Sequence, residues 1–442
     1  MSSPTSRVRE SVPGAAAMAP LSGALEFSPG SVGRVRSYLL PSFQYTGYAD
    51  TNSAFTTAPG TLDTRSTLVG SITLQRVWRR AQFNLDYAGG ALLYGTRYDR
   101  NSTAPLPSNG MMHRLSFSQT FSSRRWTIFF GDSALYLPES PFGFAGFGGL
   151  ESFGGGLGGG YLSSAGQLSP MFMPSQTILT GTARRVSSAS IAQVQYNAGS
   201  RSAITATGSY GILHFLDSGF ISSEYWTVLT GYNHAVTRKD TVAITYAHSW
   251  VRFSGVNREI LNRGLMLSYG RRITGKLALE LSAGSLVNMV AKPMGGSTTH
   301  AFWSTYDSLQ YQFRKGNLGF SFMRYMTGGS GLLLGAETNL AQMTLGHQLP
   351  RRFFGSLSLG HAYSQSLTQD RAAQRDFKYE SWQGGSSLSR EFGPHTSVYL
   401  NYDVQRQISN NPSCFGNNCG RVTLRHVAGV GINLHSRPVR ID

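Results

Sequence analysis

Hydrophobic and polar residues alternate with a period of two along most of the chain from about residue 36 onward. In residues 201–215 one face carries apolar residues and the other carries small polar ones: Ile204, Ala206, Gly208, Tyr210 and Ile212 against Thr205, Thr207, Ser209 and Gly211. Successive side chains of a β-strand point to opposite faces, so this period predicts strands with one apolar and one polar face. Residues 277–290, 397–405 and 422–434 repeat the pattern. Helical periodicity is nowhere sustained.

The alternating segments are long. They run for about 11 to 16 residues, whereas strands of soluble proteins average about 5 to 6. A tilted strand needs about 9 to 11 residues to cross the hydrocarbon layer of a bilayer. Aromatic residues stand near the strand ends, where an interfacial girdle is expected: Trp78, Tyr94, Trp126, Tyr196, Trp250 and Tyr269. The strand length therefore favours membrane-spanning strands.

Short and long connections alternate between the predicted strands. Eight tight turns join sixteen strands into hairpins, at 79–80, 122–125, 199–201, 237–240, 274–276, 314–317, 350–352 and 393–394. Longer stretches rich in Gly, Ser, Thr, Asn and Pro separate the hairpins, such as 95–110, 137–182, 291–299, 328–335 and 408–420. One strand before the first hairpin and one after the last bring the expected number to eighteen, within a range of sixteen to eighteen.

The predicted fold is all-β: a closed antiparallel up-and-down transmembrane β-barrel. We expect a flexible N-terminal extension over 1–35, the barrel over 36–434 with a long third loop at 137–182, and a C-terminal tail over 435–442. Short turns on one side and long loops on the other resemble the porin-like β-barrels of the bacterial outer membrane. The resemblance covers about 36–442 and rests on architecture, because no residue motif marks a subfamily. The chain departs from the usual pattern at its end, where Leu434 is followed by a polar tail with no terminal Phe or Trp.

Composition narrows the protein class. Only 14% of the residues are charged, against about 25% in ordinary soluble proteins. The mean hydropathy of −0.18 leaves no room for the long uncharged apolar runs of transmembrane helices. The resemblance implies the bacterial outer membrane as location and its lipid bilayer as partner. Arg7 and Arg9 precede only a weak apolar run at 15–21, which is not a clear secretory signal and speaks against export.

Basic residues gather in the short turns, and the formal net charge is +17. The turns carry Arg79, Arg80, Arg124, Arg125, Arg201, Arg238, Lys239, Lys276, Arg314, Lys315, Arg351 and Arg352. If all short turns lie on one rim, these side chains form a positive ring that raises the local concentration of anions. The alternative is that exposed turns carry charge for solubility and for contact with anionic lipid headgroups. Either interpretation leaves an anionic solute or polymer as a candidate partner.

The third long loop is a candidate constriction. It contains Phe142, Phe144, Phe147, Glu151 and Phe153 within a glycine-rich run. The position and length resemble the third loop of general trimeric porins, which folds into the lumen, and glycine lets the backbone pack closely there. The alternative is a surface loop. A G-x-G-x-x-G match inside this run carries no weight, because the run is rich in glycine and no helix follows it.

Polar residues on the inner side of the alternation are candidates for lining a lumen. They are Gln75, Asp86, Gln193, Gln195, Glu280, Gln310, Gln312, Gln342, Asp403 and Arg425. A barrel of eighteen strands is wide enough for water unless loops fill it. A one-residue slip in register would move any of these side chains to the outside. Their polarity suits a hydrated pathway or an internal hydrogen-bond network around a plug.

Other chemistry finds little support in the sequence. Cys414 and Cys419 lie in a turn-rich segment and could close a small disulfide loop in an oxidising compartment. No metal-binding motif, catalytic motif or cofactor signature occurs, so we expect neither an enzyme nor a resident metal or cofactor. The basic residues follow turn positions and form no nucleic-acid-binding module.

The leading hypothesis is a passive or gated outer-membrane channel, porin-like, that favours anionic solutes. One alternative is an export barrel for an anionic polysaccharide, resembling the eighteen-stranded alginate exporters, which predicts many arginines aligned along the height of the lumen. Another is a structural or adhesion barrel, plugged by its third loop, that transports nothing. A membrane-embedded enzyme would need a catalytic pair at the outer rim, and no pair stands out. The oligomeric state cannot be read from the sequence.

Overall fold

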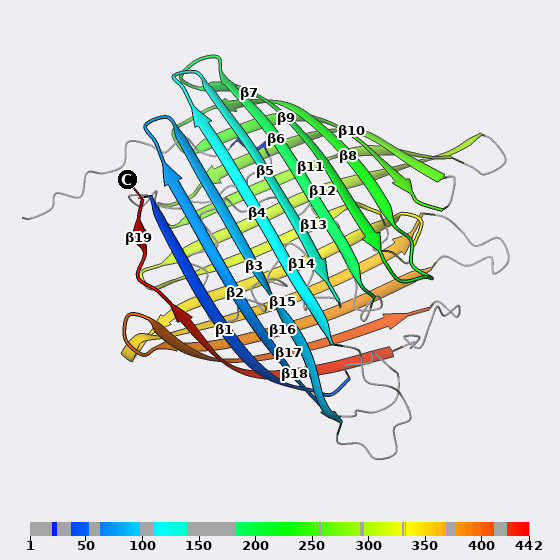
Figure 1. Cartoon of the computed structure of the whole chain (residues 1–442). Helices are drawn as coiled ribbons and strands as arrows, with labels where there is room; N and C mark the ends of the chain where they lie inside the picture. The colour runs from blue at the N-terminus through cyan, green and yellow to red at the C-terminus, as the bar shows by residue number, and fades with distance from the viewer. Residues whose placement is uncertain are drawn as a thin grey trace, which may run out of the picture.

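The chain forms a closed antiparallel β-barrel, which Figure 1 shows from the side. The computed structural model describes residues 20–23, 37–52, 62–97, 109–138, 183–255, 258–291, 296–328, 331, 333–367, 377–410 and 422–441. Eighteen long strands build the wall and a nineteenth has two residues. The predicted fold class and the expected number of strands are therefore confirmed.

Most wall strands are 12 to 17 residues long. The first nine are β1 (Tyr38–Asp50), β2 (Asp63–Val77), β3 (Ala81–Arg97), β4 (Gly110–Ser122), β5 (Trp126–Leu137), β6 (Arg185–Asn197), β7 (Ser202–Phe215), β8 (Ser223–Ala235) and β9 (Asp240–Phe253). The others are β10 (Arg258–Arg272), β11 (Leu277–Ala291), β12 (Ser297–Phe313), β13 (Gly316–Thr327), β14 (Ala336–Leu349), β15 (Phe353–Ser366), β16 (Lys378–Glu391), β17 (Thr396–Ser409), β18 (Val422–His435) and β19 (Val439–Arg440). A 3₁₀ turn at Pro350–Arg352 joins β14 to β15.

The barrel closes between its first and last long strands, which lie side by side in blue and red in Figure 1. Nine residue pairs join β1 to β18, from Ser42 opposite His435 to Asp50 opposite Val427. The C-terminal residues add to this closure, because Val439 and Arg440 of β19 pair with the start of β1. Part of the segment expected to be a tail therefore continues the sheet.

Every consecutive pair of long strands is antiparallel, so the short turns gather at one end of the barrel and the long connections at the other. The basic residues of the short turns are exposed at this short-turn end. Arg351 and Arg352 adopt positive φ angles of 60° and 64°, a left-handed conformation that is uncommon outside glycine. The basic side chains predicted to form a rim thus lie on tight turns at one end of the barrel.

The two faces of the wall differ as the alternation predicts. Ile204, Leu267 and Trp303 face outward with exposed fractions of 50%, 64% and 53%. The residue that follows each of them faces inward and is buried, as Thr205 and Ser268 show. Such an apolar outer surface is typical of barrels that stand in lipid. Tyr94 is an exception to the predicted girdle, because its register opposite Arg65 turns it inward. Among the described residues no helix is long and apolar enough to cross a membrane.

The described residues between β13 and β14 contact β9, β10 and the residues just before β8 at the long-loop end. The backbone N–H of Ile221, which precedes β8, donates a hydrogen bond to the carbonyl oxygen of Gly331 at 2.9 Å. Leu333 is buried, and Leu334 packs against an apolar cluster that includes Val251 and Ile260. Apolar contacts therefore narrow the interior at this end.

Candidate functional site

The inner wall of the barrel is the candidate functional site. Inward positions are polar over the whole height of the wall: Thr205 and Asn233 lie near the short turns, Asn262 lies farther up, and Asp50 and Arg425 lie near the long loops. The pattern follows from the sequence, because each strand alternates and the antiparallel ladders keep inward residues opposite one another. The wall therefore presents hydrogen-bonding groups to its interior.

All ten candidates for lining the lumen lie on the inner face by ladder register. Gln75, Asp86, Gln193, Glu280, Gln342 and Arg425 are buried, whereas Gln195, Gln310, Gln312 and Asp403 keep more exposure. Asp86 accepts a hydrogen bond from the Thr73 hydroxyl at 2.8 Å. Gln193 accepts one from Thr207 at 3.3 Å. The candidates do not form a single cluster, because they are spread around the circumference of the barrel.

A buried ionic cluster, here called the closure cluster, consists of Asp50, Arg65 and Arg425. Arg425 donates from Nε to both carboxylate oxygens of Asp50 at 3.0 Å, and the Arg65 Nε lies 3.7 Å from Asp50 Oδ2. The side chains of Asp50 and Arg425 are 0% and 1% exposed. Because the three residues come from β1, β2 and β18, the cluster ties the end of the chain to its beginning.

A tyrosine stands on the same part of the wall. The Tyr399 hydroxyl from β17 hydrogen-bonds with Gln44 and Thr46 of β1, across β18. Its ring occupies the space above Gly431, where an added Cβ would lie 2.2 Å from the Tyr399 Cζ. Only glycine at position 431 leaves room for this close approach. The Tyr399 side chain therefore crosses β18 and adds side-chain hydrogen bonds to the backbone pairing of β1 with β18.

A short N-terminal turn, Pro20–Gly23, lies inside the barrel and is called the lumen turn. The Ser22 backbone N–H donates to Asn233 Oδ1 at 3.3 Å, and Asn233 Nδ2 donates to Ser22 Oγ at 2.6 Å. Ser22 also hydrogen-bonds with Thr205. Gly231 makes room for the turn, because a Cβ there would lie 2.4 Å from the Ser22 Cβ. These contacts place the turn against β7 and β8 near the short-turn end.

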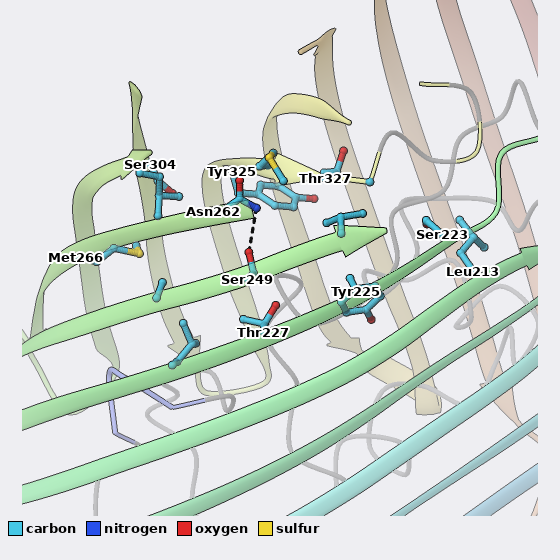
Figure 2. A pocket seen from close by; sticks show the side chains of 16 residues that line it. Leu213, Ser223, Tyr225, Thr227, Ser249, Asn262, Met266, Ser304, Tyr325 and Thr327 are labelled. Carbon is cyan, nitrogen blue, oxygen red and sulfur yellow. Dashed lines mark hydrogen bonds between the residues drawn. The ribbon is translucent and has the colours of Figure 1, made fainter. Parts of the chain in front are cut away.

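A pocket of about 90 Å³ lies on the inner wall toward the long loops (Figure 2). Apolar side chains such as Met266, Leu286 and Met326 line it together with Asn262 and Tyr325. The Asn262 Nδ2 donates to the Ser249 hydroxyl at 3.0 Å, which is the dashed line in Figure 2. No charged side chain is among the lining residues that are described.

Inward-facing arginines are unevenly distributed. Arg65, Arg114, Arg185, Arg258 and Arg425 lie in the long-loop half, and Arg272 lies near the short turns. Acidic residues stand on the same inner face, Asp50 and Glu280 among them. The described part of the inner wall therefore carries charges of both signs and no basic track along its full height.

Sequence reasoning singled out Arg425 but missed its partners Asp50 and Arg65. Their positions at strand ends with inward parity were the only available signal. It also missed the lumen turn, because no local pattern announces a contact between Ser22 and Asn233. The constriction candidates Phe142, Phe144, Phe147, Glu151 and Phe153 and the pair Cys414 and Cys419 lie outside the described residues. Within the described ranges no group of three His, Cys, Asp or Glu side chains could hold a metal ion.

Comparisons with known proteins give structural likeness only. No family model matches the chain, and no curated protein matches it. A BenF-like porin from Pseudomonas fluorescens Pf-5 is 10% identical, with a TM-score of 0.43 over 92% of this chain and 98% of that one. OpdK from Pseudomonas aeruginosa, solved with vanillate, is 9% identical, with a TM-score of 0.42 over 90% and 99%. OccK2 from the same organism, solved with glucuronate, is 8% identical, with a TM-score of 0.41 over 90% and 97%. Such values transfer neither a substrate nor a residue role.

Proposed function

We propose that this protein is a channel of the bacterial outer membrane for small polar solutes. The observation that carries the proposal is the closed wall with an apolar outer face and a polar inner face. In a closed barrel each strand pairs with a neighbour on both sides over most of its length, so the wall can stand in lipid, and polar inner residues favour a hydrated interior. Nothing in the described residues points to catalysis, since the inward polar groups are dispersed around the wall.

The channel is proposed to be narrow. Many inward polar side chains, Thr205 and Gln407 among them, are almost completely buried, which is not expected along a wide open pore. The lumen turn occupies part of the short-turn end, and Gly331 and Leu334 contact the inner wall at the long-loop end. We therefore expect a small conductance and selection of solutes by size.

A preference for anions is proposed to arise at the short-turn rim. The inner wall carries charges of both signs, whereas the short turns carry exposed arginines and lysines. Such a field acts over about 8 to 10 Å at physiological salt and shrinks as salt rises. The preference should therefore be strongest at low ionic strength.

Planar-bilayer recording of the refolded chain tests the channel and its selectivity. The variant Arg124→Gln/Arg125→Gln should lower the anion-to-cation permeability ratio by roughly twofold at low salt and have almost no effect at 1 M salt, because rim charges are screened there. The matched control is Arg184→Gln/Arg252→Gln, which removes two exposed arginines near the opposite end. Equal effects of the two double variants would contradict a selective rim.

The same bilayer recordings test whether the lumen turn narrows the channel. Asn233→Ala removes both hydrogen bonds to Ser22, so it should raise the open-channel current by roughly twofold or more as the turn leaves the wall. Asn84→Ala is the control, because Asn84 also faces inward near the short turns but contacts Ser118 instead. Absence of current from the wild type and from Asn233→Ala would favour the structural or adhesion barrel.

The polymer exporter is the less favoured alternative. It predicts inward arginines aligned along the whole height of the lumen, whereas those described gather mainly near the long-loop end. This distribution supports the small-solute channel. Secretion of an anionic polysaccharide that falls when Arg65 and Arg425 are replaced, with small-solute current unchanged, would reverse the preference.

A further inference from the structure

The wall is incomplete between β12 and β13 in its long-loop half. The β12–β13 ladder contains nine residue pairs and ends at Thr305 opposite Arg324. On its other side β12 pairs with β11 as far as Ser297. Between the described residues 302–304 of β12 and 325–327 of β13 no ladder pair forms, although β12 pairs with β11 and β13 pairs with β14 over the same stretch. We call this region the open seam.

The pocket lies directly behind the open seam. Ser304 from one edge of the seam and Tyr325, Met326 and Thr327 from the other all line it, together with residues of β7 to β11. Ser304 Oγ donates to the Arg324 carbonyl oxygen at 2.7 Å, at the point where the two strands separate. Figure 2 shows Ser304, Tyr325 and Thr327 around the same space as Met266 and Asn262. The pocket and the seam therefore share their boundary residues.

The pocket contains a buried acceptor with unused capacity. Asn262 is 5% exposed, and while its Nδ2 donates to Ser249, its Oδ1 has no hydrogen-bond partner among the described residues. Asn288 lies opposite Asn262 on β11 and is also buried. Neither its amide oxygen nor its amide nitrogen has a hydrogen-bond partner among the described residues. Buried polar groups in native proteins are nearly always paired, so an acceptor of this kind calls for a donor from a ligand or from water.

The remaining chemistry of the lining selects an uncharged ligand. Met266, Leu286 and Met326 offer an apolar surface, and the lining contains no charged side chain to pair with an ion. An apolar cavity of about 150 Å³ takes up benzene. The pocket has a smaller volume of about 90 Å³, so its ligand should be no larger than a single ring. A hydroxyl on such a ring could donate to Asn262.

We propose that the pocket binds small uncharged amphiphiles, a single ring or short alkyl chain with one hydroxyl, and that the open seam is their passage between lipid and lumen. The outer border of the seam carries Trp303, and the Arg324 guanidinium lies 4.6 Å from its ring centre. Arg324 also forms an ion pair with Glu337 of β14. This passage rests on the membrane placement proposed above and adds a lateral route to the axial channel.

Phenol is the probe for the binding site. Calorimetric titration of the refolded full chain in detergent should give saturable binding, and Asn262→Leu should weaken it about tenfold because the acceptor is lost. Asn84→Leu makes the same replacement at an inward position outside the pocket and should leave the affinity unchanged. Benzoate, a charged molecule of similar size, should bind at least about tenfold more weakly than phenol. Equal phenol affinity in the wild type and Asn262→Leu would overturn the site.

Cysteine labelling tests the passage. In a Cys414→Ser/Cys419→Ser background, Met326→Cys should react with an uncharged maleimide dissolved in the lipid about tenfold faster than Ser268→Cys. Ser268 is the control, because it faces inward on β10 between intact ladders to β9 and β11. Equal labelling rates would overturn the passage.

Channel current separates this proposal from the proposed function. Asn262→Leu should still insert into bilayers and conduct close to the wild-type level, because it removes one uncharged group among the many inward polar groups of the wall. Loss of phenol binding with normal current therefore supports the site. Normal current with no phenol binding by the wild type overturns the pocket proposal alone, and absence of membrane insertion overturns both.

Discussion

Two seams of this barrel have ladders of equal length and very different bracing. The β1–β18 seam and the β12–β13 seam each contain nine residue pairs. The first is also held by the closure cluster, by Tyr399 across β18, and by β19. Among the described residues the second has, where its strands part, the hydrogen bond from Ser304 to Arg324 and the contact of the Arg324 guanidinium with the Trp303 ring. Backbone pairing alone therefore does not determine how firmly a barrel wall is sealed.

The difference has a physical cause in chain connectivity. β12 and β13 are joined by a two-residue turn, so their pairing begins locally and can end early without separating the strands. β1 and β18 are hundreds of residues apart, and their pairing must bear the entropic cost of closing the whole chain. Side-chain bonds at the closure offset that cost, while the β12–β13 seam can be left open at one end.

The largest expected effect comes from breaking the closure cluster. Asp50→Ala leaves the buried guanidinium groups of Arg65 and Arg425 without their shared carboxylate. Removing one partner of a buried ion pair lowers the stability of a protein by about 3 to 5 kcal/mol. The free energy of unfolding, measured by urea titration of the protein in lipid vesicles, should fall by that amount. Asp217→Ala is the control, because its ion pair with Arg184 is much more exposed, with side chains 31% and 55% accessible, and should contribute far less than the buried cluster does. Similar losses in both variants would contradict a special role for the cluster.

A smaller difference should appear between the two seams in the wild type. Amide hydrogen exchange of the protein in vesicles should be roughly tenfold or more faster in residues 302–304 of β12 than in residues 42–50 of β1, because local opening is easier where one ladder is missing. Both segments lie at the membrane wall, so solvent access alone does not explain the contrast. Equal protection in the two segments would mean that the seam is closed in lipid.

The smallest effect should come from the single bond at the end of the β12–β13 ladder. Ser304→Ala should lower the free energy of unfolding by only about 1 kcal/mol, and it should speed amide exchange at residues 325–327 first. Ser356→Ala provides the control, because it removes a side-chain bond to Ser387 within an intact ladder. If the control variant also increased exchange at 325–327, Ser304 would have no particular place in holding the seam.

Much of the wall followed from local pattern. The period-two alternation was sufficient to assign the ten lumen candidates to the inner face, because each side chain's face depends only on its parity within a strand. The assignment of Tyr94 to the girdle was wrong, although parity would have corrected it. The ladder between β2 and β3 is regular from Gln82 to Tyr94, so Tyr94 lies on the same inner face as Asp86, and only its place near a strand end suggested the girdle.

The sequence by itself determined that this chain forms long two-faced strands, how many there are, and that basic turns share one end. These properties depend on neighbouring residues and on turn chemistry. Only the tertiary structure decided that Asp50 and Arg65 meet Arg425, that Ser22 docks on Asn233, and that β13 leaves β12 at Arg324. The first contact depends on closing a ring of eighteen strands, because that closure brings the two ends of the chain within bonding distance. The second joins residues 211 positions apart, and the third depends on where a ladder ends, which the alternation does not encode.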